Sequence, residues 1–304
     1  MKWEKLGLIY CADNTADRMV GYARMPTQLH LEGDVYRIYF ESRGSNNTAY
    51  PYFLDYDLVK GIVLNVHKSP ILNYGHLGTF DDNGITPFTA VRDGSSVRLY
   101  YAGWNRLLNV PFRNAIGLAI SVDNGNTFEK FSAGPVFGQD VFDPIFPTGP
   151  QVLLEDGVWR MWYTSFEKWV SKEGVIKHYY NIKHRYSEDG IFWNEKPIVS
   201  IDFQSTHEYA FVCRSVVKHD GFYKMWYSYR AQPNVDTYRI GYAESIDGLN
   251  WQRMDGLAGI DVSSDGWDSE MICYPRVFKH KGTLYMLYNG NGYGKTGFGL
   301  AVLE

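Results

Sequence analysis

The chain has 304 residues and a formal net charge of −4, which argues against nucleic acid or an anionic membrane as a partner. No apolar run approaches the roughly 18 residues of a membrane-spanning helix, and the N-terminal residues lack the apolar core of a signal peptide. The three cysteines, Cys11, Cys213 and Cys273, have no metal-like spacing. We therefore expect reduced thiols, no bound metal or other cofactor, and a cytoplasmic protein, with the oligomeric state left open.

A short aromatic segment recurs along the chain at a nearly constant period. Its five copies end at Phe40, Tyr101, Tyr163, Tyr227 and Tyr288. Successive copies are therefore 61, 62, 64 and 61 residues apart. A fixed period of this length is the signature of a repeat architecture. Five copies account for nearly the whole chain, which predicts a single domain over residues 1–304.

Each repeat shows the same pattern of strands and turns. An alternating apolar and polar segment starts at Pro26, Pro87, Pro150, Arg214 or Pro275 and ends at a glycine seven residues later. The aromatic segment, a third strand such as 116–121, and a fourth strand opened by an aromatic residue follow. Alternation bounded by Gly and Pro is typical of half-buried strands. The sequence predicts an all-β fold, a five-bladed β-propeller with four-stranded antiparallel blades.

The last repeat lacks a fourth strand after residues 298–303. The N-terminus offers one, since residues 3–6 (Trp-Glu-Lys-Leu) match residues 128–131 and 251–254. We therefore expect the N-terminal strand to close the last blade, which removes an open sheet edge.

The loops that open each repeat, and those between its second and third strands, are long and varied, so we expect the functional site on that face. The acidic candidates there are Asp82, Asp143, Glu208, Asp268 and Glu270, and the candidates for substrate binding are Arg24, Arg43, Trp104, His207, Arg230 and Asn289. For Asp81 and Asp82 an Asx turn before Gly84 is an equal alternative, and a lone histidine such as His207 is more often structural. The Asp-Gly pairs after the third strands are turn residues.

The repeated Met-Trp-Tyr strands at 161–163 and 225–227 and the Ser-x-Asp-Gly turns at Ser187 and Ser245 make the chain resemble the five-bladed propeller glycosidases. That superfamily contains arabinanases, xylosidases, invertases and levansucrases, with the related mannoside phosphorylases. The resemblance implies carboxylates at the central channel, acting as base or nucleophile, proton donor and orienting group.

The chain departs from that superfamily at the positions of the acids. The resemblance places acids one or two residues before the proline that opens a repeat, but here those places hold Arg24-Met25, Ile85-Thr86, Thr148-Gly149, Val212-Cys213 and Cys273-Tyr274. The acids of this chain cluster five to seven residues before the proline position instead. The Ser121 to Phe128 turn also resembles the sialidase Asp-box, with Arg24, Arg214 and Arg276 as a possible arginine triad. Five repeats argue against the six-bladed sialidases.

Two functions follow as alternatives. The first is a glycoside hydrolase or glycosyl-transferring enzyme acting on a small or activated sugar. In it Asp82, Glu208 and Glu270 supply the acid/base pair, and Asp143 and Asp268 orient the substrate. The second is a non-catalytic propeller that binds a glycan or a sugar nucleotide and has lost the acids.

Overall fold

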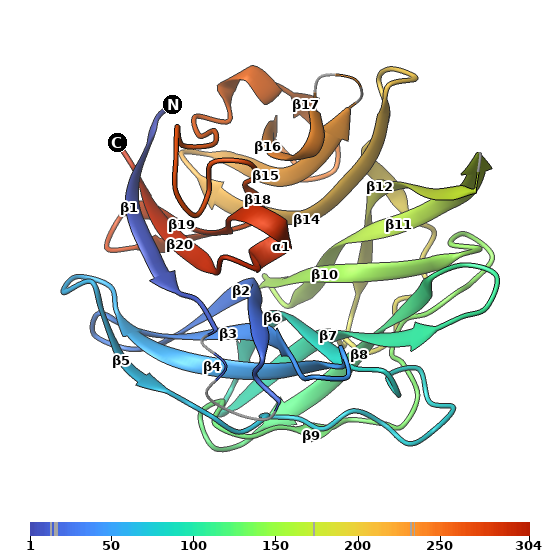
Figure 1. The fold of residues 1–304 in the computed structure, drawn as a ribbon, viewed down its shortest axis with the longest axis horizontal. Helices are drawn as coiled ribbons and strands as arrows, with labels where there is room; N and C mark the ends of the chain where they lie inside the picture. Colours follow the sequence, from blue (N-terminus) through green and yellow to red (C-terminus); the bar gives the residue numbers. More distant parts are fainter. Residues whose placement is uncertain (13, 15–17, 173, 232, 234) are drawn as a thin grey trace.

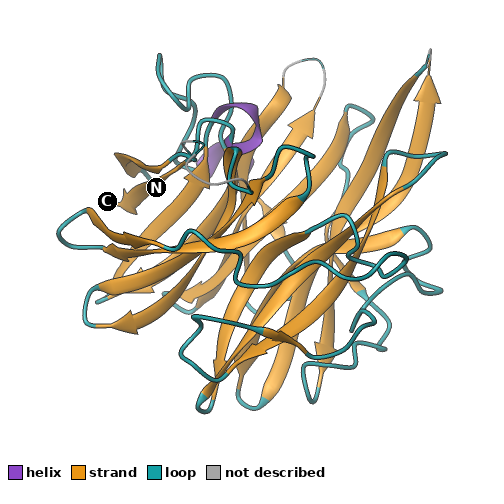
Figure 2. Cartoon of the chain, turned by 60° about the horizontal axis from the view of Figure 1, so that its bottom comes forward, coloured by secondary structure: helices purple, strands orange, loops and turns teal. Residues whose placement is uncertain are grey.

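The computed structural model describes residues 1–304 except 13, 15–17, 173, 232 and 234. Nearly all of its regular structure is strand, and Figure 2 shows the strands packed as sheets along the whole molecule. The expected all-β class with four-stranded antiparallel sheets is confirmed. Among the described residues, no helix is both long enough and apolar enough to cross a membrane.

Three sheets of the described chain have four strands each. The first runs in the order β2 (Gly21–Glu32), β3 (Val35–Arg43), β4 (Ala49–Asp57) and β5 (Ile62–Val66). The second runs in the order β6 (Ile85–Asp93), β7 (Ser96–Arg106), β8 (Phe112–Ser121) and β9 (Glu129–Lys130). The third runs in the order β18 (Cys273–His280), β19 (Thr283–Asn289), β20 (Phe298–Leu303) and β1 (Trp3–Tyr10). Consecutive strands in the chain are thus neighbours in the sheet, except where β1 joins β20.

The remaining strands form one eight-stranded sheet. One half contains β10 (Phe146–Glu155), β11 (Val158–Lys172), β12 (Val175–Ser187) and β13 (Ile198–Ile201). The other contains β14 (Glu208–His219), β15 (Phe222–Ala231), β16 (Val235–Ser245) and β17 (Gln252–Arg253). A single parallel pair, Tyr180 with Ala210, joins the halves. The sequence predicts two separate blades here; the long β12 and β14 approach each other closely enough to form this extra pair.

The N-terminal strand pairs with the last strand of the chain. β1 lies antiparallel to β20, with Trp3 opposite Leu303 and Lys5 opposite Ala301. Lys5 also contacts the loop before β18, since its Nζ lies 2.7 Å from Asp268 Oδ2. The pairing therefore joins the two ends of the chain within one sheet.

The first strand of each repeat lies toward the centre of the molecule (Figure 1). These inner strands contact one another in the cyclic order β2, β6, β10, β14, β18 and back to β2. Buried side chains bond across each junction, in the pairs Thr86 with Glu41, Thr89 with Pro150, Gln151 with Val216, Ser215 with Val277, and Asn289 with Met25. We call these contacts the inter-sheet hydrogen bonds.

A second repeated contact lies within the sheets, and we call it the tyrosine–carboxylate–cation triad. The tyrosine that ends the recurring aromatic segment of the second strand donates to a buried or half-buried carboxylate, which also pairs with a cation of the third or fourth strand. The four triads are Tyr101–Asp81–Lys130, Tyr163–Asp143–Arg185, Tyr227–Asp255–Arg253 and Tyr288–Asp268–Lys5. They anchor loop carboxylates to the sheet behind them.

The Asp-Gly turns after the third strands dock onto the preceding sheet. Asp189 Oδ1 accepts the backbone N–H groups of Ile191 and Phe192 at 2.8 and 3.0 Å, and Gly190 has a φ of 71° that favours glycine. The carbonyl of Gly190 accepts a hydrogen bond from Tyr100 Oη at 2.8 Å. The turn interpretation of these aspartates is confirmed, and the turns also hold neighbouring sheets together.

Replacing Lys5 tests the role of the N-terminal strand. In Lys5→Met the carboxylate of Asp268, which is 2% exposed, loses its cation. We expect the free energy of unfolding to fall by about 3 kcal/mol, because an unpaired buried charge remains. Urea unfolding followed by tryptophan fluorescence measures this.

The matched control is Lys2→Met, which removes the exposed Lys2–Glu304 pair beside the same strand and should change stability little. Adding Asp268→Asn to Lys5→Met should restore part of the loss. Equal effects of the two lysine substitutions would contradict this role of Lys5.

Candidate functional site

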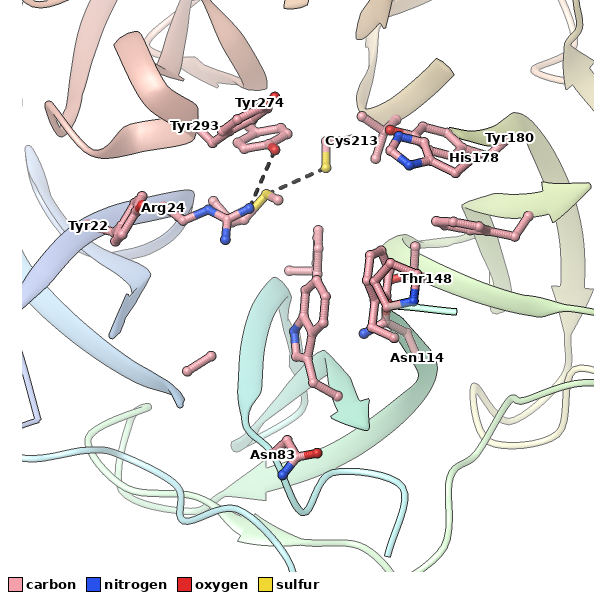
Figure 3. Close-up of a pocket in the computed structure, with 18 of the residues that line it drawn as sticks. Tyr22, Arg24, Asn83, Asn114, Thr148, His178, Tyr180, Cys213, Tyr274 and Tyr293 are labelled. Atoms are coloured by element: carbon pink, nitrogen blue, oxygen red, sulfur yellow. Dashed lines mark hydrogen bonds between the residues drawn. The ribbon is translucent and has the colours of Figure 1, made fainter. Parts of the chain in front are cut away.

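A cavity of about 440 Å³ opens at the centre of the molecule, where all four sheets meet (Figure 3). This volume is within the range of ligand pockets in proteins. The aromatic residues in its wall are Tyr22, Phe88, Trp104, Phe112, Phe166, Tyr180, Tyr238, Tyr274 and Tyr293, and the charged residues are Arg24, Arg43, Arg106 and Arg230. None of the described side chains that line the cavity is an aspartate or a glutamate.

Bulges in the inner strands shape the floor of the cavity. The register of β2, β10, β14 and β18 shifts where each strand passes the centre. At these shifts Met25, Gly149, Cys213 and Tyr274 have φ values of 53°, 58°, 51° and 57°. Positive φ in three non-glycine residues is strained backbone, which bulges use to redirect a side chain. Met25, Cys213 and Tyr274 thereby face the cavity, at the positions where the resemblance to glycosidases predicts acids.

The side chains that form the floor of the cavity are uncharged at neutral pH. Cys213 Sγ lies 3.5 Å from Met25 Sδ (Figure 3). Burial raises the pKa of the Cys213 thiol to about 12, so it stays protonated at neutral pH. Burial likewise raises the pKa of Tyr274 well above its ordinary value. Neither residue supplies a negative charge to the cavity.

One carboxylate, Glu41 on β3, lies directly behind the cavity wall. It is fully buried. Its Oε1 accepts hydrogen bonds from Arg24 Nη1 at 3.2 Å and Arg43 Nε at 3.1 Å, and Oε2 accepts one from the Thr86 hydroxyl. Burial opposes ionisation of Glu41, but Arg24, Arg43 and Thr86 together hold its pKa below the usual value. Glu41 is therefore a counter-ion that orients two arginines.

Trp104 on β7 belongs to the same network. Its Nε1 donates to Thr86 Oγ1 at 2.7 Å, which fixes the orientation of the indole. The ring lies 5.0 Å from Phe112, centroid to centroid, at an angle of 52°. The pair forms an apolar wall on the side of the cavity that β7 and β8 contribute.

The opposite wall carries Arg230 on β15. Its guanidinium lies 4.3 Å from the ring centroid of Tyr238 and 5.3 Å from that of Tyr293, and it donates to the Tyr293 hydroxyl. His178 lies nearby. Burial, with the charge of Arg230, lowers the pKa of His178 to about 4. This imidazole is therefore neutral at pH 7.

Several polar atoms in the cavity wall lack a hydrogen-bond partner among the described residues. They are Arg24 Nε, Asn114 Oδ1, His178 Nε2 and Arg230 Nε. Buried polar atoms of native proteins are nearly always bonded to protein, water or ligand. The two guanidinium nitrogens are hydrogen-bond donors and the amide oxygen of Asn114 is an acceptor. The wall therefore contains both kinds of group that a polar ligand can bond.

The predicted binding residues separate into two groups. Arg24, Arg43, Trp104 and Arg230 all line the cavity. His207 is exposed and Asn289 is fully buried, and neither belongs to the cavity lining. Asn289 has a structural role, because its amide bonds the Met25 N–H at 2.9 Å and the Ala23 carbonyl at 2.6 Å.

The predicted acids are not brought together at the cavity, and none of the five lines it. Asp143 and Asp268 belong to triads, and Glu208 pairs with Arg253 at 2.7 Å. Asp82 accepts hydrogen bonds from the Gly78 N–H at 2.9 Å and the Asn105 amide at 2.8 Å, which order the loop before β6. Glu270 is exposed.

The sequence contains a signal for Glu41, which was not among the predicted site residues. In each repeat one residue directly follows the recurring aromatic segment, and these residues are Glu41, Ala102, Thr164, Ser228 and Asn289. All five are fully buried. An acid at a position otherwise held by small or uncharged residues indicates a buried partner of opposite charge. Arg106, the last residue of β7, also lines the cavity and was not among the predicted binding residues.

Solved structures with a similar fold are glycoside hydrolases. A putative glycoside hydrolase from Bacteroides ovatus matches with a TM-score of 0.71 and 15% identity, covering 97% of this chain and 91% of that one. A thermostable family-43 glycoside hydrolase matches with a TM-score of 0.68 and 18% identity, covering 95% and 90%. An endo-arabinase from Bacteroides thetaiotaomicron matches with a TM-score of 0.65 and 12% identity, covering 98% of both chains. Identities this low establish the fold alone.

No protein-family model matches the sequence. Two full-length relatives occur in Mycobacterium tuberculosis: the protein MT1551 of strain CDC 1551 is 42% identical over 305 residues, and Rv1502 of strain H37Rv is 42% identical over 306 residues. In both cases the match covers all of both chains, and both relatives carry the description "uncharacterized protein". The chain therefore belongs to the family of these two mycobacterial proteins, and its fold is that of the β-propeller glycosidases.

Proposed function

We propose that this protein is a carbohydrate-binding propeller whose ligand is a saccharide with a negative charge, such as a sugar phosphate or a sugar nucleotide. We further propose that the sheets form five blades, the eight-stranded sheet representing two of them, and that β1 completes the last blade. The observation that carries the functional proposal is the wall of the cavity, with four arginines and, among its described residues, no carboxylate.

The charge balance supports an anionic ligand. Arg24 and Arg43 share the single carboxylate of Glu41. No ion pair found among the described residues includes Arg106 or Arg230. Guanidinium groups bind phosphate through two parallel hydrogen bonds, and the interaction strengthens where water is excluded. An unliganded cavity of this charge is an attractive site for a phosphate group.

The aromatic walls support the saccharide part of the ligand. Trp104 with Phe112 on one side and Tyr293 on the other present aromatic surface next to hydrogen-bonding groups. Such a surface accepts the C–H side of a sugar ring or the face of a nucleobase. Asn114 and His178 supply an amide and a neutral imidazole for hydroxyl groups.

Glycosidic cleavage is a second candidate, favoured by the fold shared with glycoside hydrolases. It needs one protonated and one ionised carboxyl at the sugar. Glu41 is the carboxylate adjacent to the cavity, but its depressed pKa and its bonds to two arginines suit a permanent anion rather than a proton donor. The proposed acids Asp82, Asp143, Glu208, Asp268 and Glu270 would have to reach the cavity through a rearrangement of their loops.

Binding measurements test the proposal. Isothermal titration against a panel of nucleoside-diphosphate sugars, sugar 1-phosphates and the matching neutral sugars should give saturable binding only for the charged members. Arg230→Met should weaken that binding roughly 10- to 100-fold, because one charge-assisted contact is lost. Arg230→Lys should recover part of it.

Arg92→Met serves as the control. Arg92 is an exposed arginine of β6 that bonds the His30 carbonyl outside the cavity, so its loss should leave affinity unchanged. Neutral sugars that bind as tightly as their phosphorylated forms would refute the anionic requirement.

A turnover assay separates the two candidates. If the protein is a binding propeller, the saccharide recovered after long incubation is intact by mass spectrometry, for the native protein and Glu41→Gln alike. Glu41→Gln should instead weaken binding, because Arg24 and Arg43 lose the group that orients them. Release of a cleaved sugar that disappears in Glu208→Gln, in protein with an unchanged melting temperature, would establish the hydrolase in its place.

A further inference from the structure

A small second cavity lies beneath the first, in the channel between the inner strands. Its volume is about 10 Å³, which is close to the space that one water molecule needs. Met25, Phe88, Cys213 and Tyr274 line both cavities, so these four side chains separate them. Two further side chains in the lower wall are Arg214 of β14 and Arg276 of β18.

These two arginines are buried without a counter-charge. Arg214 is 2% exposed and Arg276 is 8% exposed. No ion pair among the described residues includes either one. Their hydrogen bonds go to neutral groups: Arg214 Nη1 donates to Thr164 Oγ1 at 3.1 Å, and Arg276 Nη2 donates to the Phe88 carbonyl and, at 3.5 Å, to Thr89 Oγ1. Arg214 Nε has no partner.

Neighbouring groups do not supply the missing negative charge. Burial lowers the pKa of Arg214 to about 9 and that of Arg276 to about 10, so both remain charged at pH 7. The thiol of Cys213 stays protonated, as described above, and the carboxylate of Glu41 is already paired with Arg24 and Arg43. Two like charges in a dry interior are strongly unfavourable unless an anion lies between them.

We propose that a monatomic anion of the size of chloride binds in this channel, between the guanidinium groups of Arg214 and Arg276. The space of about 10 Å³ that both arginines line favours a small anion, and Arg276 also lines a wider pocket of about 330 Å³. The wall of Met25, Phe88, Cys213 and Tyr274 separates the channel from a saccharide in the upper cavity, so this site is independent of the proposed function. The anion links β14 to β18 and supports the floor on which the upper ligand rests.

Bromide, which scatters anomalously, locates the site directly. Crystals of the full chain grown in gluconate and soaked in sodium bromide should show one strong anomalous peak between the two guanidinium groups. A map without a peak there, at bromide concentrations that label other sites, would overturn the proposal.

Thermal unfolding tests the same site in solution. At constant ionic strength, exchange of gluconate for chloride should raise the melting temperature of the native protein by a few degrees, with saturation, because a ligand that binds the folded state stabilises it. Arg276→Met and Arg214→Met should lose this response. Each variant should equal or exceed the native protein in gluconate, where the uncompensated charge is a cost, and fall below it in chloride.

The exposed Lys2→Met removes a positive charge away from the channel and should keep the full chloride response. A chloride response retained by both channel variants, or lost by Lys2→Met as well, would show that the effect is general and would refute the site. If a channel variant fails to fold, the bromide map of the native protein decides alone.

Discussion

The inter-sheet hydrogen bonds are the constraint on which the rest of the structure depends. Their side chains are buried, so each must be satisfied by the neighbouring sheet. Gln151 bonds both the carbonyl and the N–H of Val216, at 2.9 and 2.6 Å, and Asn289 bonds backbone groups of β2. These bonds draw the inner strands together around the centre. The channel is narrowest, with a space of about 10 Å³, beneath Met25, Cys213 and Tyr274. A cavity of about 440 Å³ lies on one side of these residues, and Gln151 and Val216 line a further pocket of about 330 Å³.

The triads explain why several of the predicted acids do not face the cavity. A carboxylate such as Asp143 accepts hydrogen bonds from Tyr163 and Ser165 and pairs with Arg185, so its oxygens are occupied behind the sheet. The bulged positions nearest the cavity hold Met25 and Tyr274 instead, which carry no charge. Asp143 and Asp268 thus pair with the sheet, and the charged side chains that line the central cavity are arginines.

Sequence reasoning succeeded where the information is local or periodic. The strands, the four-stranded antiparallel sheets and the Asp-Gly turns depend on spacing and residue type, and the structure contains them. Sequence reasoning did not predict the directions in which the side chains of the loops point. Distance from a proline does not say whether a loop acid such as Glu208 faces the centre or Arg253. Two of the three partners of Glu41, Arg24 and Thr86, come from β2 and β6, which no single-strand pattern contains. The Tyr180–Ala210 bridge depends on how two long hairpins meet.

Both central cavities are lined by positively charged side chains. The chain as a whole is acidic, with a net charge of −4, yet the walls of the two cavities carry six arginines (Arg24, Arg43, Arg106, Arg214, Arg230 and Arg276) and, among their described residues, no carboxylate. Glu41, which pairs with Arg24 and Arg43, balances a single charge. A concave, low-dielectric site lined by one sign concentrates the opposite sign. Because Met25, Phe88, Cys213 and Tyr274 form both the roof of the channel and the floor of the cavity, an anion below them reduces the repulsion between Arg214 and Arg276. The strained floor then keeps the shape that the upper ligand requires.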